Sequence, residues 1–392
     1  FKANQYRYAF DYKELPSVYL KQFGIKIDEY VKHHHSHMAG GYYTAPFDDA
    51  MTLTIDAIGE METMTIWDNE KMIARQQYPL SLGLLYSAVT KRIGLKPNEE
   101  EYITMGMAAY GKPTLAEHMK KFLLKRNNHK GIGYYCDYAK DYDLAASVQK
   151  VYEDELNRIV KKYCKKINLV LSGGCALNCV ANSNLKRNIW IMPNPGDSGS
   201  SLGCIPAVTK QKLNWKGPFL GYNIRGEYPV DSIIKELETN KMVGVANGRA
   251  EFGPRALGNR SLLADPRGPE VKDMVNEIKK RQKFRPFAPA ILLEDVHDYF
   301  DMPQPTSPYM QFVGKCKYPK EFPAIIHADG TSRVQTVTKE DNEGFYNLLK
   351  TWKDKTGCPM LLNTSLNIKG MPMVNDRWDA RKFEEKYNVK VV

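Results

Sequence analysis

The chain has 392 residues, a formal net charge of +11 at pH 7 and 43% hydrophobic residues, enough for two domains with sizeable cores. No segment reaches the roughly 18 apolar residues of a membrane span and no charged-then-apolar leader opens the sequence, so we expect a cytoplasmic protein without a membrane partner. Its seven cysteines are odd in number and contain no Cys-x-x-Cys pair. This argues against a zinc ribbon or a disulfide framework.

A run of histidines is the first informative feature. Residues 1–30 are predicted to form an amphipathic connection that leads into Val31–Ala39, where His33 and His37 are four residues apart. If this segment is helical, both imidazoles lie on one face and can bind one metal ion, while His34 points to another face. A solvated polar run or a tag is the alternative. The run is internal, however, and leads directly into apolar residues.

Glycine turns follow two predicted strands. Residues 50–56 and 62–67 read as strands around a turn that contains Gly59, and a strand over residues 167–172 runs into a turn and then a helix. Glycine lets backbone N–H groups approach a phosphate closely at a helix N-terminus. Each turn alone is more often a simple corner. The candidate residues of phosphate-binding loops, whether at an adenylate or at another site, are Gly59, Ser172, Gly173, Gly174 and Asn178.

A small-residue loop over residues 193–203 opens another predicted helix. Asp197 in this loop either caps the helix or supplies a carboxylate to the two histidines. Two imidazoles and one carboxylate with open positions suit iron(II), manganese or zinc, and of these we expect iron(II).

Glycine and proline residues at 214–221 predict a domain boundary, which gives domains at 1–215 and 222–392. The second half carries basic side chains in turns rich in glycine, proline and polar residues. Arginine forks and a lysine point charge are what a triphosphate or an acyl phosphate requires, although a surface salt bridge explains any one of them alone. The residues of this predicted anion pocket are Arg255, Arg260, Lys279, Arg285 and Arg333.

Seven motifs, in order over nearly the whole chain, carry a specific resemblance. They are His33-His-His-Ser-His37, Ser81-Leu-Gly-Leu-Leu-Tyr-Ser87, Met105-Gly-Met-Ala-Ala-Tyr-Gly111, Leu171-Ser-Gly-Gly-Cys-Ala-Leu-Asn178, Glu251-Phe-Gly-Pro-Arg-Ala-Leu-Gly-Asn-Arg-Ser261, Phe284-Arg-Pro-Phe-Ala-Pro289 and Asn363-Thr-Ser-Leu-Asn367. The chain resembles the O-carbamoyltransferase family of nodulation and antibiotic-tailoring enzymes.

The resemblance implies an α/β protein, with an N-terminal domain of the actin/sugar-kinase/heat-shock-protein type and a YrdC-like C-terminal domain. It implies that ATP, with magnesium, and carbamoyl phosphate give carbamoyl-adenylate, whose carbamoyl group is transferred to an acceptor hydroxyl. The family's metal ligands fall on His33, His37 and Asp197. Lys279 and Arg285 take the catalytic role in adenylate formation. The further nucleotide and carbamoyl phosphate contacts fall on Arg255, Arg260, Arg333, Ser365 and Asn367.

The sequence departs from the family pattern in two places. The family normally opens with a strand hairpin carrying a Gly-x-His-Asp-x-Ser-like element, and nothing corresponding precedes Phe1. Ile103 stands where the pattern usually has lysine. We expect that an N-terminal segment is absent from this chain or that the chain is a divergent member.

The positive charge exceeds what one nucleotide requires, which favours an anionic polymer as partner. We expect a 5-hydroxymethylpyrimidine, such as 5-hydroxymethylcytosine, in DNA or its nucleotide as the acceptor, by analogy with carbamoyltransferases of DNA-modifying viruses. The alternatives are a hydroxyl of a small metabolite or sugar, and a degenerate module that only binds nucleotide or nucleic acid. Threonylcarbamoyl transfer to tRNA is disfavoured, because the motifs at 251–261 and 284–289 are those of the O-carbamoyl branch.

Overall fold

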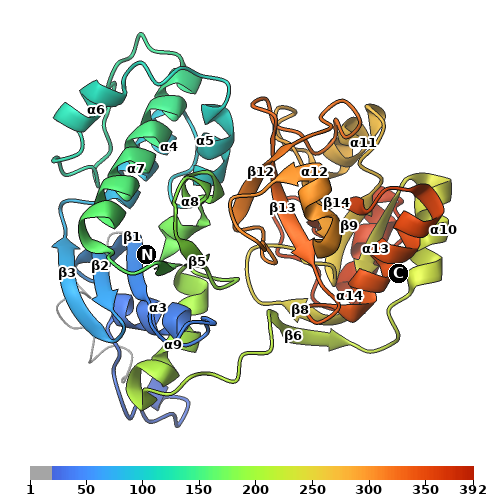
Figure 1. Cartoon of the computed structure of the whole chain (residues 1–392), viewed down its shortest axis with the longest axis horizontal. Coiled ribbons are helices and arrows are strands. Elements are labelled where there is room, and N and C mark those ends of the chain that lie inside the picture. The colour runs from blue at the N-terminus through green and yellow to red at the C-terminus, as the bar shows by residue number, and fades with distance from the viewer. Residues whose placement is uncertain (1–19) are drawn as a thin grey trace.

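The computed structural model describes residues 20–392, so most of the predicted N-terminal connection lies outside the described residues. Two halves lie side by side, each built on its own sheet (Figure 1). Within the described residues no helix is both long and apolar enough to cross a bilayer.

The N-terminal half contains a mixed five-stranded sheet in the order β3-β2-β1-β4-β5. Its first three strands pair antiparallel, whereas β1, β4 and β5 are parallel. The strands are β1 (Met51–Gly59), β2 (Glu62–Asp68), β3 (Lys71–Gln77), β4 (Asn168–Ser172) and β5 (Asn188–Trp190). The three strands predicted at 50–56, 62–67 and 167–172 are confirmed as β1, β2 and β4.

Helices cover both faces of this sheet because successive side chains along a strand point to opposite faces. Leu53 and Leu171 pack with helices α4 and α7, while Val170 and Trp67 pack with α3. Helix α9 lies against α3 (Figure 1). The helices of this half are α3 (His33–Tyr42), α4 (Leu82–Arg92), α5 (Glu101–Ala108), α6 (Ala116–Phe122), α7 (Asp141–Tyr163), η1 (Gly174–Leu177), α8 (Cys179–Ser183) and α9 (Asp197–Thr209).

The C-terminal half contains a seven-stranded sheet in the order β11-β12-β13-β10-β14-β9-β7, in which only β10 and β13 pair in parallel. The strands are β7 (Met242–Ala246), β9 (Arg260–Ala264), β10 (Ala288–Leu292), β11 (Phe300–Asp301), β12 (Phe312–Cys316), β13 (Thr331–Val337) and β14 (Met360–Ser365). Strands β6 (Phe219–Ile224) and β8 (Gly248–Glu251) form a separate antiparallel ribbon.

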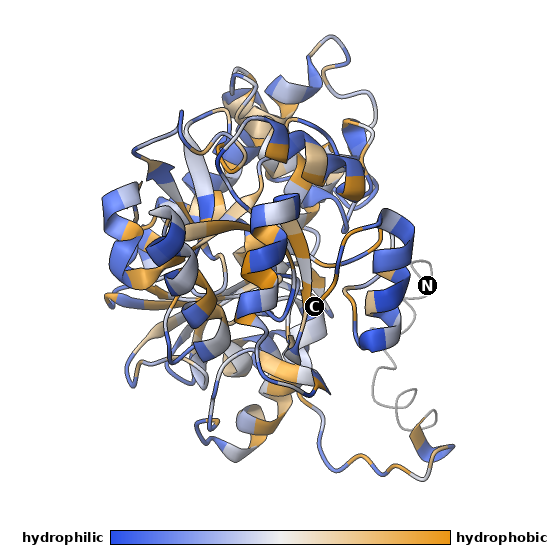
Figure 2. Cartoon of the chain, turned by 90° about the vertical axis from the view of Figure 1, so that its right-hand side faces the viewer, coloured by the Kyte–Doolittle hydropathy of each residue, from blue (hydrophilic) through white to orange (hydrophobic). Residues whose placement is uncertain are grey.

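The helices of the C-terminal half are α10 (Val230–Asn240), α11 (Glu270–Lys279), η2 (Leu293–Asp295), α12 (Val296–Tyr299), α13 (Glu343–Thr356) and α14 (Arg377–Tyr387). Helices in Figure 2 carry hydrophilic and hydrophobic stripes, as expected for elements with one face on a core. With helices packed on sheets in both halves, the predicted α/β class is confirmed. The YrdC-like assignment of this half stays a prediction.

The hydrophobic cores divide near the predicted boundary. Core residues of the first half run to Ala207 and those of the second begin at Ile224. Phe312 is the exception, since this residue of β12 packs into the core of the N-terminal half. The domain ranges themselves stay a prediction.

Close contact between α3 and α9 depends on Gly203. A Cβ on this residue would lie 1.8 Å from the Ser36 carbonyl oxygen, so the helices would have to separate. We expect Gly203→Ala to lower the free energy of unfolding by about 1–3 kcal/mol. The clash should outweigh the higher helix propensity of alanine compared with glycine. Urea unfolding measures this. Gly106→Ala in α5 is the matched control, because its nearest contact would be an ordinary 3.6 Å, and an equal loss in both variants would contradict the explanation.

Candidate functional sites

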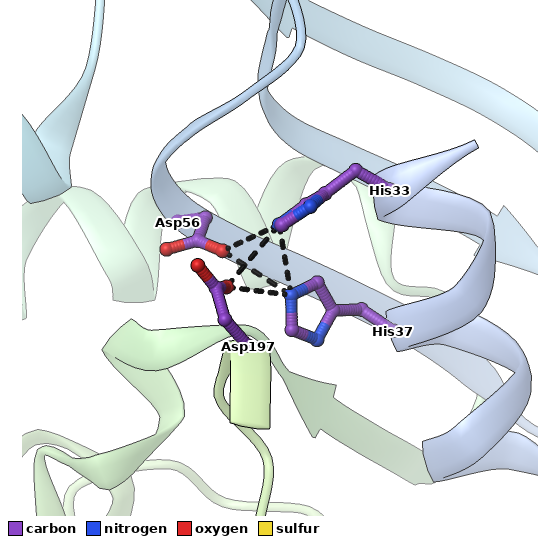
Figure 3. Close-up of side chains that lie close together, drawn as sticks. All are labelled: His33, His37, Asp56 and Asp197. Atoms are coloured by element: carbon purple, nitrogen blue, oxygen red, sulfur yellow. Dashed lines mark hydrogen bonds and ion pairs between the residues drawn. The ribbon is translucent and has the colours of Figure 1, made fainter. Parts of the chain in front are cut away.

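A cluster of two imidazoles and two carboxylates lies where α3 meets the end of β1 and the start of α9 (Figure 3). The Nε2 atoms of His33 and His37 are 3.0 Å apart. Oδ2 of Asp56 lies 3.2 Å from the His33 nitrogen and 3.3 Å from the His37 nitrogen. Oδ1 of Asp197 lies 3.2 Å from both. The predicted helix and the predicted convergence of His33, His37 and Asp197 are therefore present in the structure.

These four atoms fit a metal ion better than a hydrogen-bond network. An imidazole Nε2 carries at most one hydrogen, so it cannot donate at once to two carboxylates and a second imidazole. Nitrogen and oxygen ligands held at about 2.0–2.2 Å from one ion lie roughly 3.0–3.4 Å from each other, which matches the spacing here. Two imidazoles and two carboxylates suit a divalent transition metal.

The charges of the cluster are strongly coupled. Burial alone would lower the pKa of His33, but hydrogen bonds to Asp197 and Asp56 outweigh it and raise that pKa to about 10. The same carboxylates raise the pKa of His37 against its burial. The hydrogen bonds from both histidines hold the pKa of Asp197 far below its usual range. The carboxylates therefore stay ionised and draw a positive charge to the point where the four side chains meet.

Surrounding residues fix the imidazoles. The Nδ1 atom of His34 lies 3.1 Å from Thr65 Oγ1, and burial lowers the pKa of His34 to about 3, so it is a neutral core residue on another face, as predicted. A Cβ on Gly59 would lie 2.2 Å from the His33 ring. Gly59 thus packs closely against the His33 ring, and its role as an adenylate or transfer-site loop residue stays a prediction.

Asp56 is the cluster member that the sequence reading missed. It lies within β1, directly after the buried residues 51–55, and only 8% of its surface is exposed. An acidic residue at the end of an apolar strand, 19 residues after His37, is the signal that was available. Burial alone would raise its pKa, but hydrogen bonds from His33 and His37 lower it instead.

The glycine turn after β4 supports the same cluster. Gly173 has a φ of +83° and its Cβ would lie 2.2 Å from the Ile55 carbonyl oxygen, so only glycine fits. A Cβ on Gly174 would lie 3.3 Å from Asp56 Oδ1. Ser172 bonds Thr54 at 2.7 Å between β4 and β1, and Asn178 caps α8 and bonds Gln149. The side chains of Ser172 and Asn178 therefore form hydrogen bonds within the N-terminal half.

A second site surrounds Lys279 at the end of α11. Its Nζ donates to the Ser365 carbonyl oxygen at 2.7 Å and to Ser365 Oγ at 3.1 Å, and also to Asn367 Oδ1. The three predicted ligand residues Lys279, Ser365 and Asn367 are thus brought together. Ser365 and Asn367 line a cavity of about 510 Å³ together with Gly253 and Pro254.

Four arginines gather near this lysine, and within residues 20–392 none of them forms an ion pair with a carboxylate: Arg255, Arg281, Arg285 and Arg333. Burial and the positive charge of nearby Arg333 lower the pKa of Arg255 to about 9. Burial and the charges of Arg285 and Arg333 lower the pKa of Arg281. Arg333 Nε is buried and has no hydrogen-bond partner within residues 20–392. Arg281 donates to the Pro286 carbonyl oxygen and Arg285 to Gln282 Oε1, but both acceptors are neutral. Half-buried guanidinium groups that repel one another without a neutralising carboxylate indicate an anion pocket. Arg281 was not selected from the sequence, although it lies in the basic tract between Lys279 and Arg285.

Arg260 does not belong to this pocket. Its side chain is completely buried and donates to five backbone carbonyl oxygens, those of Asn247, Gly248, Asn259, Tyr222 and Asn375. With Nη1 and Nη2 engaged by the backbone, it cannot bind a ligand anion. The prediction for Arg260 is corrected: it is a structural residue that ties the β6–β8 ribbon to the segment before α14.

The loop that carries Arg255 is shaped by Glu251, whose Oε1 accepts hydrogen bonds from the backbone N–H groups of Leu257, Asn259 and Arg260. In the same loop a Cβ on Gly253 would lie 2.5 Å from the Pro193 carbonyl oxygen, four residues before Asp197. The arginine loop therefore packs on the chain segment that leads to the histidine and aspartate cluster.

A second contact joins the halves. The Tyr110 hydroxyl donates to the Phe284 carbonyl oxygen at 2.9 Å, and the guanidinium of Arg285 lies 4.5 Å from the ring centre of Tyr102. Tyr102 and Tyr110 come from the N-terminal half, beside the position of Ile103. The segment that carries Arg285 is thus held against the first half.

Family models match both halves. The model described as the carbamoyltransferase N-terminus matches residues 2–139 and 125–205, and that of the carbamoyltransferase C-terminus matches residues 234–392. The chain belongs to the carbamoyltransferase family. The predicted family and enzyme class are therefore confirmed, and the histidine cluster and the arginine pocket lie one in each matched part.

Several curated proteins are similar to this chain over half of its length or more. An uncharacterized protein of Synechocystis is 34% identical and the alignment covers 89% of this chain and 72% of that protein. Nodulation protein NolNO of Sinorhizobium fredii is 30% identical, with 92% of this chain and 62% of that protein covered. Nodulation protein U of the same species is 38% identical over 52% of this chain and 40% of its own length. The chain thus spans between two fifths and three quarters of these relatives.

Solved structures resemble this carbamoyltransferase only weakly. The activator of 2-hydroxyisocaproyl-CoA dehydratase from Clostridium difficile has a TM-score of 0.34 at 15% identity, covering 46% of this chain and 66% of that chain. Full-length HypF has a TM-score of 0.31 at 19% identity, covering 43% and 21%. At these scores the likeness carries no argument.

Proposed function

We propose that the protein is an ATP-dependent O-carbamoyltransferase that forms carbamoyl-adenylate in its C-terminal half and transfers the carbamoyl group in its N-terminal half. The observation that carries the proposal is the pairing of two different sites across one interface. One holds cations that form no ion pair within residues 20–392, and the other gathers side chains that could bind a metal. A simple binding module has no need of both.

The cation pocket suits the first step. Carbamoyl phosphate loses its phosphate to water and leaves carbamate, whose oxygen attacks the α-phosphorus of ATP and expels pyrophosphate. Two anions must meet, so Lys279 and the guanidinium groups of Arg255, Arg285 and Arg333 offset their repulsion and stabilise charge that develops in the transition state. ATP enters as its magnesium complex.

The histidine cluster suits the second step. His33, His37, Asp56 and Asp197 would hold one divalent metal, proposed as iron(II), which as a Lewis acid polarises a carbonyl group. The acceptor hydroxyl oxygen bonds to the carbamoyl carbon while the bond to AMP breaks, and the hydroxyl proton goes to solvent. The packing of Gly59 and Gly174 holds the ligand side chains in position for this transfer.

We propose a 5-hydroxymethylpyrimidine in DNA, or its nucleotide, as the acceptor. The net charge of +11 supports an anionic acceptor. At the C-terminal end of α7, Lys161, Lys162 and Lys165 are exposed and form no ion pair within residues 20–392. Lys166 beside them is neutralised by Asp49 and Asp68. A base in duplex DNA must leave the stack to reach a transfer site.

Mass spectrometry tests the acceptor. DNA that contains 5-hydroxymethylcytosine, and the corresponding nucleotide, are each incubated with protein, ATP, carbamoyl phosphate and iron(II). A gain of one carbamoyl group on either supports the proposal. Carbamoyl-adenylate formation without any gain contradicts the pyrimidine acceptor and directs the search to hydroxyls of small metabolites and sugars. Failure to form carbamoyl-adenylate contradicts the two-step reaction itself.

The first step should depend on pH through Lys279. Burial, reinforced by Arg281 and Arg285, lowers the pKa of Lys279 to about 7. Lys279 is charged below this pKa and neutral above it, so kcat/KM for carbamoyl phosphate in pyrophosphate release should fall as pH rises through about 7. In Lys279→Arg the charge persists, so the falling limb should move to higher pH. An unchanged profile in this variant would assign the limb to another group.

A further inference from the structure

A second polar hollow lies apart from the two sites described above. It has a volume of about 690 Å³ and lies between the β6–β8 ribbon and the start of α14. We call it the ribbon hollow. It is lined by Tyr222, Asn223, Ile224, Arg225, Arg249, Asp376, Arg377 and Trp378.

The ribbon hollow is distinct from the 510 Å³ cavity at Ser365 and Asn367, which we call the Ser365 cavity. Gly221 and Ala250 line the Ser365 cavity, whereas their neighbours Tyr222 and Arg249 line the ribbon hollow. The two cavities share no lining residue, so the ribbon hollow is a separate site beside the same two strands.

Three exposed arginines converge on the ribbon hollow. Within residues 20–392, Arg225, Arg249 and Arg377 form no ion pair with a carboxylate. The one carboxylate in the lining, Asp376, accepts hydrogen bonds from the backbone N–H groups of Trp378 and Asp379. The hollow thus presents an excess of unpaired positive charge, which suits a phosphate group.

Two exposed aromatic rings lie in the same lining. Trp378 is 64% exposed and Tyr222 is 57% exposed. The Lys382 ammonium, which also pairs with Asp379 at 3.7 Å, lies 5.3 Å from the centre of the Trp378 ring. Large aromatic side chains left in water beside arginines are suited to stacking on a flat ring that carries a negative group.

The walls of the hollow are tied together before any ligand arrives. Buried Arg260 donates to the carbonyl oxygens of Tyr222 and Asn375, one in each wall. Arg377 donates to the Arg225 carbonyl oxygen at 3.0 Å across the same gap. A preformed site loses less conformational entropy on binding.

From these observations we infer that the ribbon hollow binds a nucleotide-like ligand, a flat ring that bears a phosphate. The phosphate lies among Arg225, Arg249 and Arg377, and the ring stacks on Trp378. The volume is in the usual range for a site of this ligand size. The inference is independent of the adenylation and transfer steps proposed above.

Tryptophan fluorescence of the full chain tests the inference with AMP as the probe. AMP should quench Trp378 with saturation, and Trp378→Phe should remove that quenching while leaving any AMP binding at the Ser365 cavity. Arg225→Ala and Arg249→Ala should each weaken AMP binding about tenfold or more. Arg381→Ala is the matched control, because this exposed arginine of α14 does not line the hollow.

A short single-stranded oligonucleotide is the second probe. Tighter quenching by the strand than by AMP would show that the ring and phosphate come from a nucleic acid, and tighter quenching by AMP would show a free nucleotide. Absence of saturable quenching by both, or equal affinity in the Arg225→Ala, Arg249→Ala and Arg381→Ala variants, would overturn the inference. Circular dichroism of each variant excludes loss of fold as the cause.

Discussion

Replacing Lys279 by alanine is expected to lower carbamoyl-phosphate-dependent exchange of pyrophosphate into ATP roughly a hundred- to a thousandfold. Lys279 is the point charge nearest to Ser365 and Asn367, and its Nζ donates to both residues. Without it, the repulsion between carbamate and the triphosphate is offset only by the arginines. The measurement is the exchange of labelled pyrophosphate at saturating ATP.

Lys280→Ala is the matched control for this experiment. Lys280 follows Lys279 at the end of α11, but its backbone has left-handed angles and its side chain lies outside the bonds to Ser365 and Asn367. It should exchange pyrophosphate like the unmodified protein. If Lys279→Ala kept full exchange, the C-terminal half would not be the adenylate-forming site. His33→Ala should keep exchange and lose transfer, and equal loss of both steps would contradict the two-site assignment.

Local patterns predicted the parts of the fold that depend on local sequence. Strands β1, β2 and β4 were predicted from short apolar runs bounded by turns, and α3 from the spacing of His33 and His37. Asp197 was found because a small-residue loop before a helix is visible in the sequence. The arrangement of β7 and β9 to β14 into one sheet depends on pairing between residues that are distant in sequence, which no local pattern predicts.

The sequence could not separate structural arginines from ligand arginines. Arg260 and Arg255 lie in one motif with similar neighbours. In the structure Arg260 enters the start of β9 and is fully buried among backbone carbonyl oxygens, while Arg255 in the preceding loop has no protein acceptor within residues 20–392. The β6–β8 ribbon and the segment at Asn375 create this difference, because they cover the guanidinium of Arg260 but not that of Arg255.

Asp56 was missed for a related reason. A carboxylate at the end of the predicted strand 50–56 is equally typical of a turn residue. Asp56→Ala is expected to weaken binding of a divalent metal by more than about a hundredfold, because loss of a direct ligand should exceed the ten- to hundredfold effect of losing a supporting one. The loss also leaves His33 and His37 with one carboxylate instead of two. Metal content after dialysis against iron(II) or zinc measures this without any assay of activity.

The same variant distinguishes a metal site from an ion-pair network. Asp49→Ala removes an exposed carboxylate beside β1 that pairs with Lys166, and it should leave metal content unchanged. Asp56→Ala should keep pyrophosphate exchange, because the arginine pocket does not contact Asp56, yet it should stop carbamoyl transfer. If Asp56→Ala bound metal like the unmodified protein while Asp197→Ala did not, the site would have three protein ligands, and Asp56 would serve to orient the imidazoles.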